Sequence, residues 1–340
     1  MSVKTRVICG ITTLFLLFGL VAIGPVQASL PVQENGKKEK KEKKEKKETD
    51  DPNAGRPVLW TERDMESLDL TVGGQESKDV PSPSDKYTFV ARDPGGTSEK
   101  IIVKDDKGRS WTVKFGPEAR PETAASRIVW AAGYYVDPVF FIDRTHVEGR
   151  GGFDIWDVRF ERDDDGLKTL GPWSWDANHF KGTREYQGLQ TVMALINNWD
   201  LKDENNKIAR PNKESGGDQS LRVYYVSDLG GTLGSTGNGL RKIPGFGNLP
   251  AGSKGNPNGF ANQVFIDGVE NGMVKFHYEG KNPDALQGVT VENARWMGNL
   301  LGRLSDKQLT DAFRAGGFKD DEVAIYVRAM RDRINKLKSL

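Results

Sequence analysis

Short apolar runs dominate the first half of the chain, whereas helical spacing dominates its C-terminal part. Between residues 85 and 162 the runs are rich in β-branched and aromatic side chains and are bounded by turn residues, as is typical of strands. The predicted strands cover residues 87–92, 101–104, 110–115, 139–142 and 153–160. Later apolar residues recur at steps of three and four and predict helices over 290–304, 305–315 and 320–337. The pattern predicts an α+β fold, β-rich first and mainly helical afterwards.

A helix and a strand are also expected in the middle of the chain. Apolar side chains in 183–199 recur mostly at helical steps, which gives a helix with one buried face and places Asp200 at its end. The run 221–226 is β-branched and aromatic, so it predicts a strand that ends just before Asp228. Helix, polar loop, strand and acidic turn follow one another in this order.

Local signals indicate two further features of the C-terminal half. Strands are expected at 264–266 and 273–278, and Asp267 with Gly268 is expected to form the hairpin turn between them. Residues 305–308, which begin with Ser and end with Gln, have the spacing of a helix capping box.

The polar loop 198–205 and the acidic turn 226–230 carry the most informative chemistry. Asp200 and Asn205 keep the five-residue offset of the protein-kinase catalytic loop H-R-D-L-x-x-x-N, and Asp228 leads a turn that takes the place of D-F-G. A carboxylate at Asp200 can orient an attacking hydroxyl and accept its proton.

Three further residues of these motifs have expected roles. Asn205 and Asp228 offer the oxygen ligands that Mg²⁺ prefers, and Lys202 is expected near the transferring phosphate. The alternative is that this segment is an Asp- and Asn-rich turn that follows a helix.

The first half supplies candidates for holding a nucleotide. Lys114 lies on the third predicted strand, and Glu122 follows eight residues later at the start of a helix, which is the arrangement of the kinase lysine–glutamate ion pair. Gly95 and Gly96 lie in the turn between the first two strands, where backbone N–H groups can approach phosphates. The alternatives are a surface lysine, a helix-stabilising acid and an ordinary hairpin turn.

The segment 95–139, with I-V-K-D-D-K-G, V-K-F-G-P-E and E-T-A-A-S-R-I-V-W-A-A-G, resembles the N-lobe of the phosphatidylinositol 3/4-kinase-related and HipA-type atypical kinases. These families place a glycine turn, a strand lysine and an E-x-x-A-S helix in this order. The resemblance covers about residues 85–234 and implies a bilobal protein-kinase-like fold. Its β-rich N-lobe would cover 57–160, and its mainly helical C-lobe would cover 161–340 with a Gly-rich insertion at 230–259.

The resemblance also implies roles for individual residues. ATP would be bound by Lys114 with Glu122 as its partner, Asp200 would be catalytic, and Asn205 and Asp228 would bind the metal. This set implies ATP and Mg²⁺ as cofactors and a hydroxyl-bearing protein, lipid or sugar as acceptor.

The chain departs from the kinase pattern at three positions. Asn198, Trp199 and Leu229 replace the usual His, Arg and Phe. Two function classes therefore stay open. One is a phosphotransferase that uses Mg-ATP, and the other is a non-catalytic, pseudokinase-like binding protein of the cell envelope.

The N-terminus has the pattern of a secretory signal. Residues 1–28 combine a basic start, an apolar run and small residues before Ser29, so cleavage there predicts an exported chain, periplasmic or extracellular. The alternative is that residues 7–24 remain as a membrane anchor. Cys9 is the only cysteine and lies within the signal, so the mature chain would contain no disulfide.

A lysine- and glutamate-rich tract follows the signal. Residues 29–56 have too few apolar side chains to offset their ordering entropy and predict a disordered linker, which could contact an anionic envelope surface. The whole chain holds 49 Lys and Arg against 48 Asp and Glu. Such a near-neutral balance argues against nucleic acid as the main partner.

Overall fold

The computed structural model describes residues 50–75, 77–95, 98–163, 166–236, 240–243, 247–250 and 252–340. The expected signal 1–28, the alternative anchor 7–24, the linker up to residue 49, Gly96 and parts of the Gly-rich segment 230–259 lie outside these ranges. Within them, no helix is both long enough and apolar enough to cross a bilayer.

Residues 50–56, the end of the expected linker, belong to the folded part. Asp50 accepts hydrogen bonds from Lys168 at 2.6 Å and from Arg210 at 2.8 Å. The first strand, β1 (Arg56–Val58), pairs with a strand far along the chain. The linker prediction therefore extends too far, because pairing with distant residues orders this segment.

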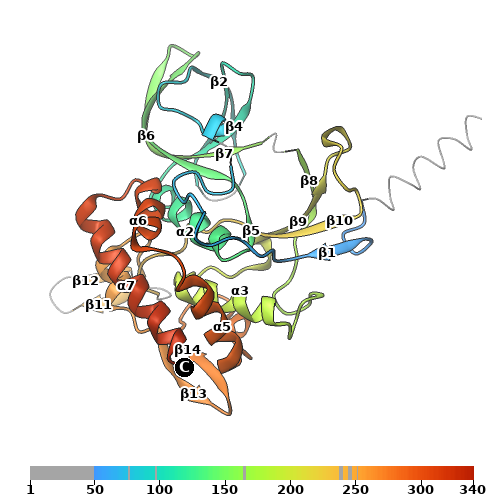
Figure 1. Cartoon of the computed structure of the whole chain (residues 1–340). Helices are drawn as coiled ribbons and strands as arrows, with labels where there is room; N and C mark the ends of the chain where they lie inside the picture. Colours follow the sequence, from blue (N-terminus) through green and yellow to red (C-terminus); the bar gives the residue numbers. More distant parts are fainter. Residues whose placement is uncertain are drawn as a thin grey trace, which may run out of the picture. The chain divides into compact units, whose positions relative to one another are not determined.

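Five strands of the first half close into a barrel in the order β2-β3-β4-β7-β6 (Figure 1). They are β2 (Tyr87–Asp93), β3 (Lys100–Asp105), β4 (Ser110–Lys114), β6 (Val139–Glu148) and β7 (Phe153–Arg162). Alternating side chains point inward, and Tyr87, Trp111 and Phe160 fill the interior. The indole N–H of Trp111 donates to the buried carboxylate of Asp105 at 3.0 Å. The structure confirms all five expected strands and extends the last two.

Helix α2 (Ala119–Ala131) follows β4 and packs on β6 and β7 of the barrel. It also contacts helix α6 (Asp306–Ala315), so it lies between the barrel and the C-terminal helices (Figure 1). Most of its residues are buried, which small side chains such as Ala124 and Ala125 permit. The helix begins three residues before Glu122, so Glu122 lies in its first turn, shortly after the end of β4.

A second sheet carries the strand that leads to Asp228. Its order is β1-β10-β9-β8, and β5 also pairs with β10. The remaining bounds are β5 (Tyr135–Val136), β8 (Leu167–Gly171), β9 (Asn206–Pro211) and β10 (Leu221–Val226). Because β1 and β5 pair along β10 in parallel and β9 pairs with it antiparallel, β10 is held on both edges.

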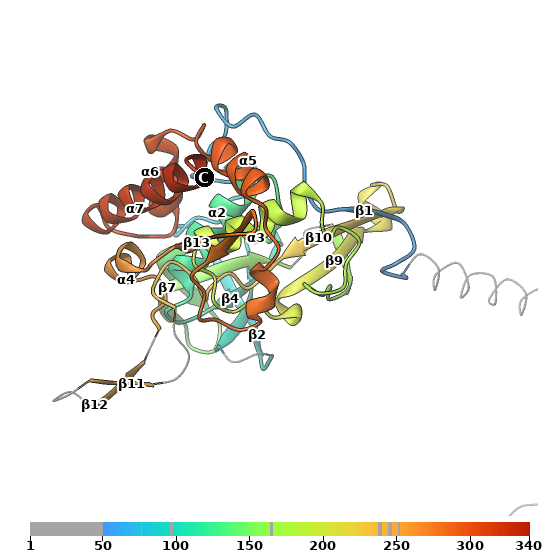
Figure 2. The same ribbon diagram turned by 90° about the horizontal axis from the view of Figure 1, so that it is seen from below.

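The larger of the two hydrophobic cores combines side chains of α2, of β9 and β10, and of five further helices. These five are α3 (Arg184–Leu195), α4 (Pro257–Asn262), α5 (Val291–Leu301), α6 and α7 (Asp320–Lys338). Helices α5 and α6 both pack against α7 (Figure 2). The expected capping box is present, since the Ser305 hydroxyl accepts from the Gln308 N–H and the Gln308 side chain accepts from the Ser305 N–H. The Thr183 side chain caps α3, which ends at Leu195 rather than at Asp200.

The residues before the barrel pack against both hydrophobic cores, the earlier ones against the larger core and the later ones against the barrel. Met65 and Leu70 are fully buried with the helices, and the Gln308 side chain donates to the carbonyls of Met65 and Leu68 at 2.8 and 3.0 Å. The segment beyond residue 76 covers the barrel instead, where Thr145 donates to the Pro83 carbonyl at 2.9 Å.

The expected hairpin is present, but the prediction that Asp267 and Gly268 form its turn is wrong. Both residues lie within β13 (Ile266–Glu270), where the register shifts, and the turn to β14 (Met273–Phe276) is made by Asn271 and Gly272. The φ angles of these two residues are 50° and 75°, which suit the Asn-Gly type of hairpin turn. The Gly-rich segment holds a second hairpin, β11 (Leu240–Ile243) with β12 (Gly247–Pro250).

Candidate active site

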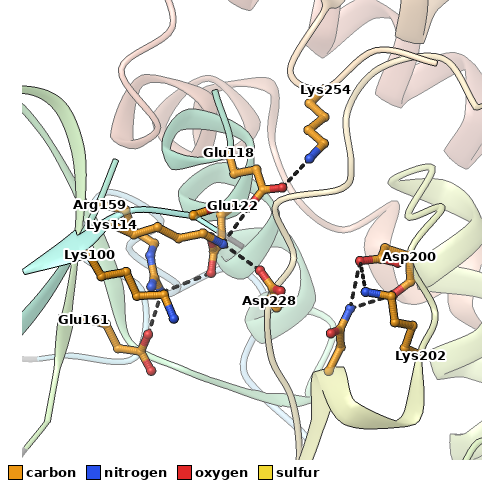
Figure 3. Close-up of polar contacts among 12 residues, drawn as sticks. Lys100, Lys114, Glu118, Glu122, Arg159, Glu161, Asp200, Lys202, Asp228 and Lys254 are labelled. Atoms are coloured by element: carbon orange, nitrogen blue, oxygen red, sulfur yellow. Dashed lines mark hydrogen bonds and ion pairs between the residues drawn. The ribbon is translucent and has the colours of Figure 1, made fainter. Parts of the chain in front are cut away.

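The ammonium group of Lys114 joins three segments of the chain. Its Nζ lies 3.2 Å from Glu122 Oε2, 2.7 Å from Glu118 Oε2 and 2.7 Å from Asp228 Oδ1 (Figure 3). Lys114 ends β4, the two glutamates flank the start of α2, and Asp228 follows β10. We call these four residues the Lys114 cluster. The expected ion pair of Lys114 with Glu122 is present, and Asp228 joins it.

Local structure explains why these side chains meet. Glu118 and Glu122 are four residues apart across the first turn of α2, so both carboxylates project from one helix face. Asp228 has a φ of 48°, in the left-handed region that non-glycine residues rarely occupy and Asp tolerates better than most. This backbone conformation turns the chain sharply after β10. Strained backbone of this kind is concentrated at functional sites.

Two further cations complete the charge balance. Arg159 Nη1 on β7 lies 3.0 Å from Glu122 Oε1 and 2.6 Å from Glu161 Oε2. Lys254, from the segment before α4, pairs with Glu118 and lies over the Trp199 ring at 5.4 Å. Each glutamate of the Lys114 cluster therefore contacts two basic side chains.

In the Lys114 cluster, burial and the neighbouring charges shift the pKa values of the lysine and of both glutamates in opposite directions. Lys114 is only 4% exposed, and although burial lowers the pKa of its ammonium, Glu122 and Asp228 outweigh burial and raise it. Burial raises the pKa of Glu118, but Lys114 and Lys254 outweigh it and lower the pKa to about 2. For the fully buried Glu122, burial raises the pKa of the carboxyl and Arg159 and Lys114 oppose the rise.

Asp200 is the centre of a second polar group on the neighbouring loop. Its carboxylate lies 3.0 Å from Lys202 Nζ and 2.9 Å from Lys281 Nζ. Asn205 donates its amide N–H to the Asp200 carbonyl at 2.7 Å and to the carboxylate at 3.3 Å. Burial raises the pKa of Asp200, but the hydrogen bonds from the two lysines prevail and lower it. Asp200 is thus a carboxylate at neutral pH, held in a fixed position.

Asn198 and Trp199, two of the departures from the kinase pattern, also have local contacts here. The Asn198 side-chain oxygen accepts from the Asp200 N–H at 3.0 Å, which orients the loop. The Trp199 carbonyl accepts from the Lys281 N–H at 2.9 Å and so brings Lys281 beside Asp200.

The turn after β10 connects the two groups. The Ser227 N–H donates to the Asn205 carbonyl at 2.8 Å, and the Trp199 N–H donates to the Gly231 carbonyl at 3.0 Å. A Cβ added to Gly230 would lie 2.6 Å from the Cβ of Glu118, and one on Gly231 would lie 3.2 Å from the Cβ of Asp200. The two glycines therefore let one turn pass closely between both groups, with Asp228 at its start (Figure 3).

Among the described residues of the glycine turn between β2 and β3, Ser98 reaches the Lys114 cluster. The Ser98 hydroxyl donates to Glu118 at 3.5 Å, at the limit of a hydrogen bond. The Gly95 N–H donates to Asp93 at 2.8 Å within its own turn, and Gly96 is outside the described residues. Phosphate binding by these glycines stays a prediction.

Sequence inspection missed four charged residues of the site, namely Glu118, Arg159, Lys254 and Lys281. Glu118 had a local signal, since it lies one helical turn before Glu122. Arg159 is on a strand beside β4, but nothing in its neighbourhood indicates an ion pair with α2. Lys254 and Lys281 come from segments without a motif, so only the tertiary structure could reveal them.

The oxygen atoms of the site suit a hard divalent cation. One carboxylate oxygen from each of Glu118, Glu122 and Asp228 lies within 4.8 Å of the others. The Asp228 side chain is 46% exposed, and Asn205 uses its amide N–H toward Asp200, which leaves its oxygen for another partner. Carboxylate and amide oxygens are the ligands that Mg²⁺ prefers. The donor set therefore fits a magnesium site that includes Asp228.

Comparisons with known proteins give only distant likenesses. No family model and no curated protein matches the chain. Among solved structures, a proinflammatory kinase of Helicobacter pylori, CtkA, is 12% identical with a TM-score of 0.40, over 74% of this chain and 93% of that chain. The Golgi casein kinase is 9% identical with a TM-score of 0.40, over 93% and 92%. Its structure with Mn/ADP bound is 10% identical with a TM-score of 0.34, over 93% and 92%. Values this low leave the activity of this chain to be inferred from its own geometry.

The close approach of Gly230 to Glu118 can be tested by Gly230→Ala. The added methyl would lie 2.6 Å from Glu118 Cβ and must push that side chain away from Lys114. We expect the free energy of unfolding to fall by about 1–3 kcal/mol in equilibrium denaturation. The matched control is Gly268→Ala, since no heavy atom lies within 4 Å of a Cβ there. Equal effects of the two substitutions would contradict the close packing.

The lowered pKa of Glu118 makes a pH-dependent prediction for Glu118→Gln. Because the folded-state pKa of about 2 is below the ordinary 4.5, the charged carboxylate stabilises the fold above about pH 4.5. This contribution disappears as pH falls through about 2. We expect the wild type to exceed the variant by roughly 1–3 kcal/mol at pH 7 and the gap to close toward pH 2, measured by urea denaturation.

The control for this series is Glu214→Gln, which removes an exposed carboxylate. Its stability difference from the wild type should stay small at every pH. A gap for Glu118→Gln that is independent of pH would show that the carboxylate charge does not stabilise the cluster.

Proposed function

We propose that the chain is a phosphotransferase of kinase-like, bilobal fold that uses Mg-ATP to phosphorylate a hydroxyl-bearing acceptor. The barrel and α2 correspond to the N-lobe in this proposal, and the second sheet with the C-terminal helices corresponds to the C-lobe. The expected lobe boundaries at 57–160 and 161–340 remain a prediction, although β1, which precedes the barrel, pairs with β10 in the second sheet.

The observation that carries the proposal is the position of the Lys114 ammonium. It lies between a helix glutamate at 3.2 Å and the aspartate that follows β10 at 2.7 Å. Kinases need a strand lysine, a helix glutamate and a metal-binding aspartate at one place, because they position and neutralise the phosphates of ATP. Lys114, Glu122 and Asp228 come from three separate elements and meet at this place.

Asp200 is the residue that would orient the acceptor hydroxyl. Its low pKa keeps it ionised, so it can accept a hydrogen bond from the hydroxyl and take its proton as the oxygen attacks. Lys202, 3.0 Å from Asp200, would offset the negative charge of the transferring phosphoryl group. Lys281 adds a second positive charge at the same carboxylate.

Asp228 and the amide oxygen of Asn205 would hold Mg²⁺, with Glu118 as a further candidate ligand. When bound, the ion would neutralise phosphate charge and help to align the nucleotide. Lys114 already contacts the carboxylates, so its ammonium is placed to donate hydrogen bonds to phosphate oxygens on the same side.

A non-catalytic, nucleotide-binding protein is the second candidate. The observation that favours it is the double ion pair of Asp200 with Lys202 and Lys281, because an acceptor hydroxyl must compete with Lys281 for the carboxylate. Such a protein would bind Mg-ATP without transferring phosphate.

Binding and transfer can be measured separately on the purified chain. We expect Mg-ATP at a hundredfold excess over its dissociation constant to stabilise the wild type by about 2.7 kcal/mol in thermal or chemical unfolding. Asp228→Asn should abolish this effect, because it removes the anionic ligand while Asn still tolerates the left-handed backbone. Unchanged stabilisation in Asp228→Asn would exclude the proposed site.

Asp200→Asn distinguishes the two candidates. If the chain is an enzyme, this variant should keep Mg-ATP binding and lose phosphate release or self-phosphorylation by about 100-fold or more, because the base is gone. A wild type that binds Mg-ATP but transfers no phosphate, like the variant, would favour the non-catalytic protein.

We also propose that the chain is exported after cleavage before Ser29, on the basis of the pattern in residues 1–28. The lysine-rich linker would then be free to contact an anionic envelope surface. N-terminal sequencing of the mature chain should begin at Ser29, whereas a retained Met1 would favour an anchor at residues 7–24.

A further inference from the structure

A cavity of about 650 Å³ lies beside α2, outside the Lys114 cluster. Its walls come from α2, β5, β10, the end of β7, the start of β8 and described residues of the segment before the barrel. Arg63, Arg127 and Arg162 line it together with the aromatic side chains of Trp130, Tyr135 and Tyr225. Small-molecule sites in proteins have volumes of about 300–1,000 Å³ and usually combine apolar walls with a few polar groups.

The cavity is distinct from the Lys114 cluster because it faces another side of α2. Arg127 is five residues after Glu122, and at about 100° per residue the two side chains project roughly 140° apart around the helix. Glu122 points to Lys114 and Arg159, whereas Arg127 lines the cavity. None of the Lys114 cluster residues lines it.

Arg127 is a buried cation with no carboxylate of the described residues in ion-pair contact, although the more distant Asp69 carboxylate opposes the fall of its pKa. Its side chain lies over the Phe140 ring at 5.1 Å, and its one hydrogen bond to a described residue is a long contact of 3.4 Å to the Ser126 hydroxyl. The residue is 3% exposed, and within the described part of the chain its Nε has no hydrogen-bond partner. Burial lowers the pKa of Arg127 to about 10. Burying a charge without a close counter-ion is costly, so a buried arginine at this position is typical of a site that binds an anion.

The other charged groups at the cavity do not neutralise Arg127. Arg63 donates to the Trp130 carbonyl at 2.8 Å and lies over the Trp130 ring, and no described carboxylate pairs with it. Asp79 lies 3.5 Å from Arg162, and Asp137 pairs with Lys207. The two acidic residues that line the cavity thus pair with Arg162 and Lys207, and neither forms an ion pair with Arg63 or Arg127.

We propose that this cavity binds a small molecule that carries a phosphate or carboxylate group, with Arg127 and Arg63 as its charge partners. Guanidinium groups bind both oxyanions through paired N–H donors, and a partly buried site strengthens such contacts. The oxyanion would supply the counter-charge that Arg127 lacks, and the aromatic walls would contact the rest of the ligand. The site does not depend on nucleotide binding at the Lys114 cluster.

The test is the stability of the full chain in the presence of inorganic pyrophosphate, with citrate as the carboxylate probe. Divalent cations are removed with EDTA, no nucleotide is added, and sodium chloride keeps the ionic strength constant. We expect a saturable stabilisation of the wild type, in which the unfolding equilibrium constant falls about 100-fold at a hundredfold excess over the dissociation constant. Which of the two probes acts identifies the preferred oxyanion.

Arg127→Met separates a binding role from a structural one. Met keeps an apolar stem of similar length, so without anion the variant should be at least as stable as the wild type, because a buried unpaired charge has been removed. It should lose the response to the effective probe. Arg63→Met changes a less buried position and should weaken the same response. It replaces Arg127→Met in the test if that variant does not fold.

Arg120→Met is the matched control. Arg120 lies on the same helix but pairs with Asp157 at 2.8 Å and does not line the cavity, so the variant should respond like the wild type. Asp228→Asn should also respond, which keeps this test independent of the nucleotide site. The proposal is overturned if neither probe stabilises the wild type in a saturable way, or if Arg127→Met and Arg63→Met keep the full response.

Discussion

The contact of one lysine with three carboxylates organises the centre of this protein. Lys114 ends a barrel strand, Glu118 and Glu122 begin α2, and Asp228 follows the central strand of the second sheet. These segments belong to parts of the molecule with separate hydrophobic cores. Apolar packing stabilises each core by itself, but it does not specify how a strand end, a helix start and a turn meet. The charges do so, because Lys114 and Glu122 are buried and each would be costly without its partners.

The same requirement explains the less regular features around the cluster. Asp228 adopts a left-handed backbone, and two glycines follow it so that the turn can pass close to Glu118 and to Asp200. Arg159 reaches Glu122 from the barrel, and Lys254 reaches Glu118 from the Gly-rich segment. Helix α2 carries a buried charge on two of its sides, Glu122 on one and Arg127 on another. On the side of the Lys114 cluster the charges are paired, whereas Arg127 on another side is not.

Much of the local structure could be predicted because apolar spacing reports it directly. The barrel strands, α2, α3 and the C-terminal helices all carry a period of two or of about 3.6 residues. The errors arose where a long-range partner or a competing local signal prevailed. Residues 50–56 are ordered by β10 and by Lys168 and Arg210, and Asn271 with Gly272 provides a stronger turn than Asp267 with Gly268.

The sequence by itself determined the order of the elements and the residues that bear chemistry in the two motifs, because spacing along a chain is a local property. Lys114, Glu122, Asp200, Lys202, Asn205 and Asp228 were all identifiable in this way. Only the tertiary structure decided which charges meet. In it, Glu118 and Arg159 contact the Lys114–Glu122 ion pair, and Lys281 lies beside Asp200. Arg127 is buried with no described carboxylate in ion-pair contact. Ion pairing depends on distances of a few ångströms between segments far apart in the chain, and no local pattern encodes those distances.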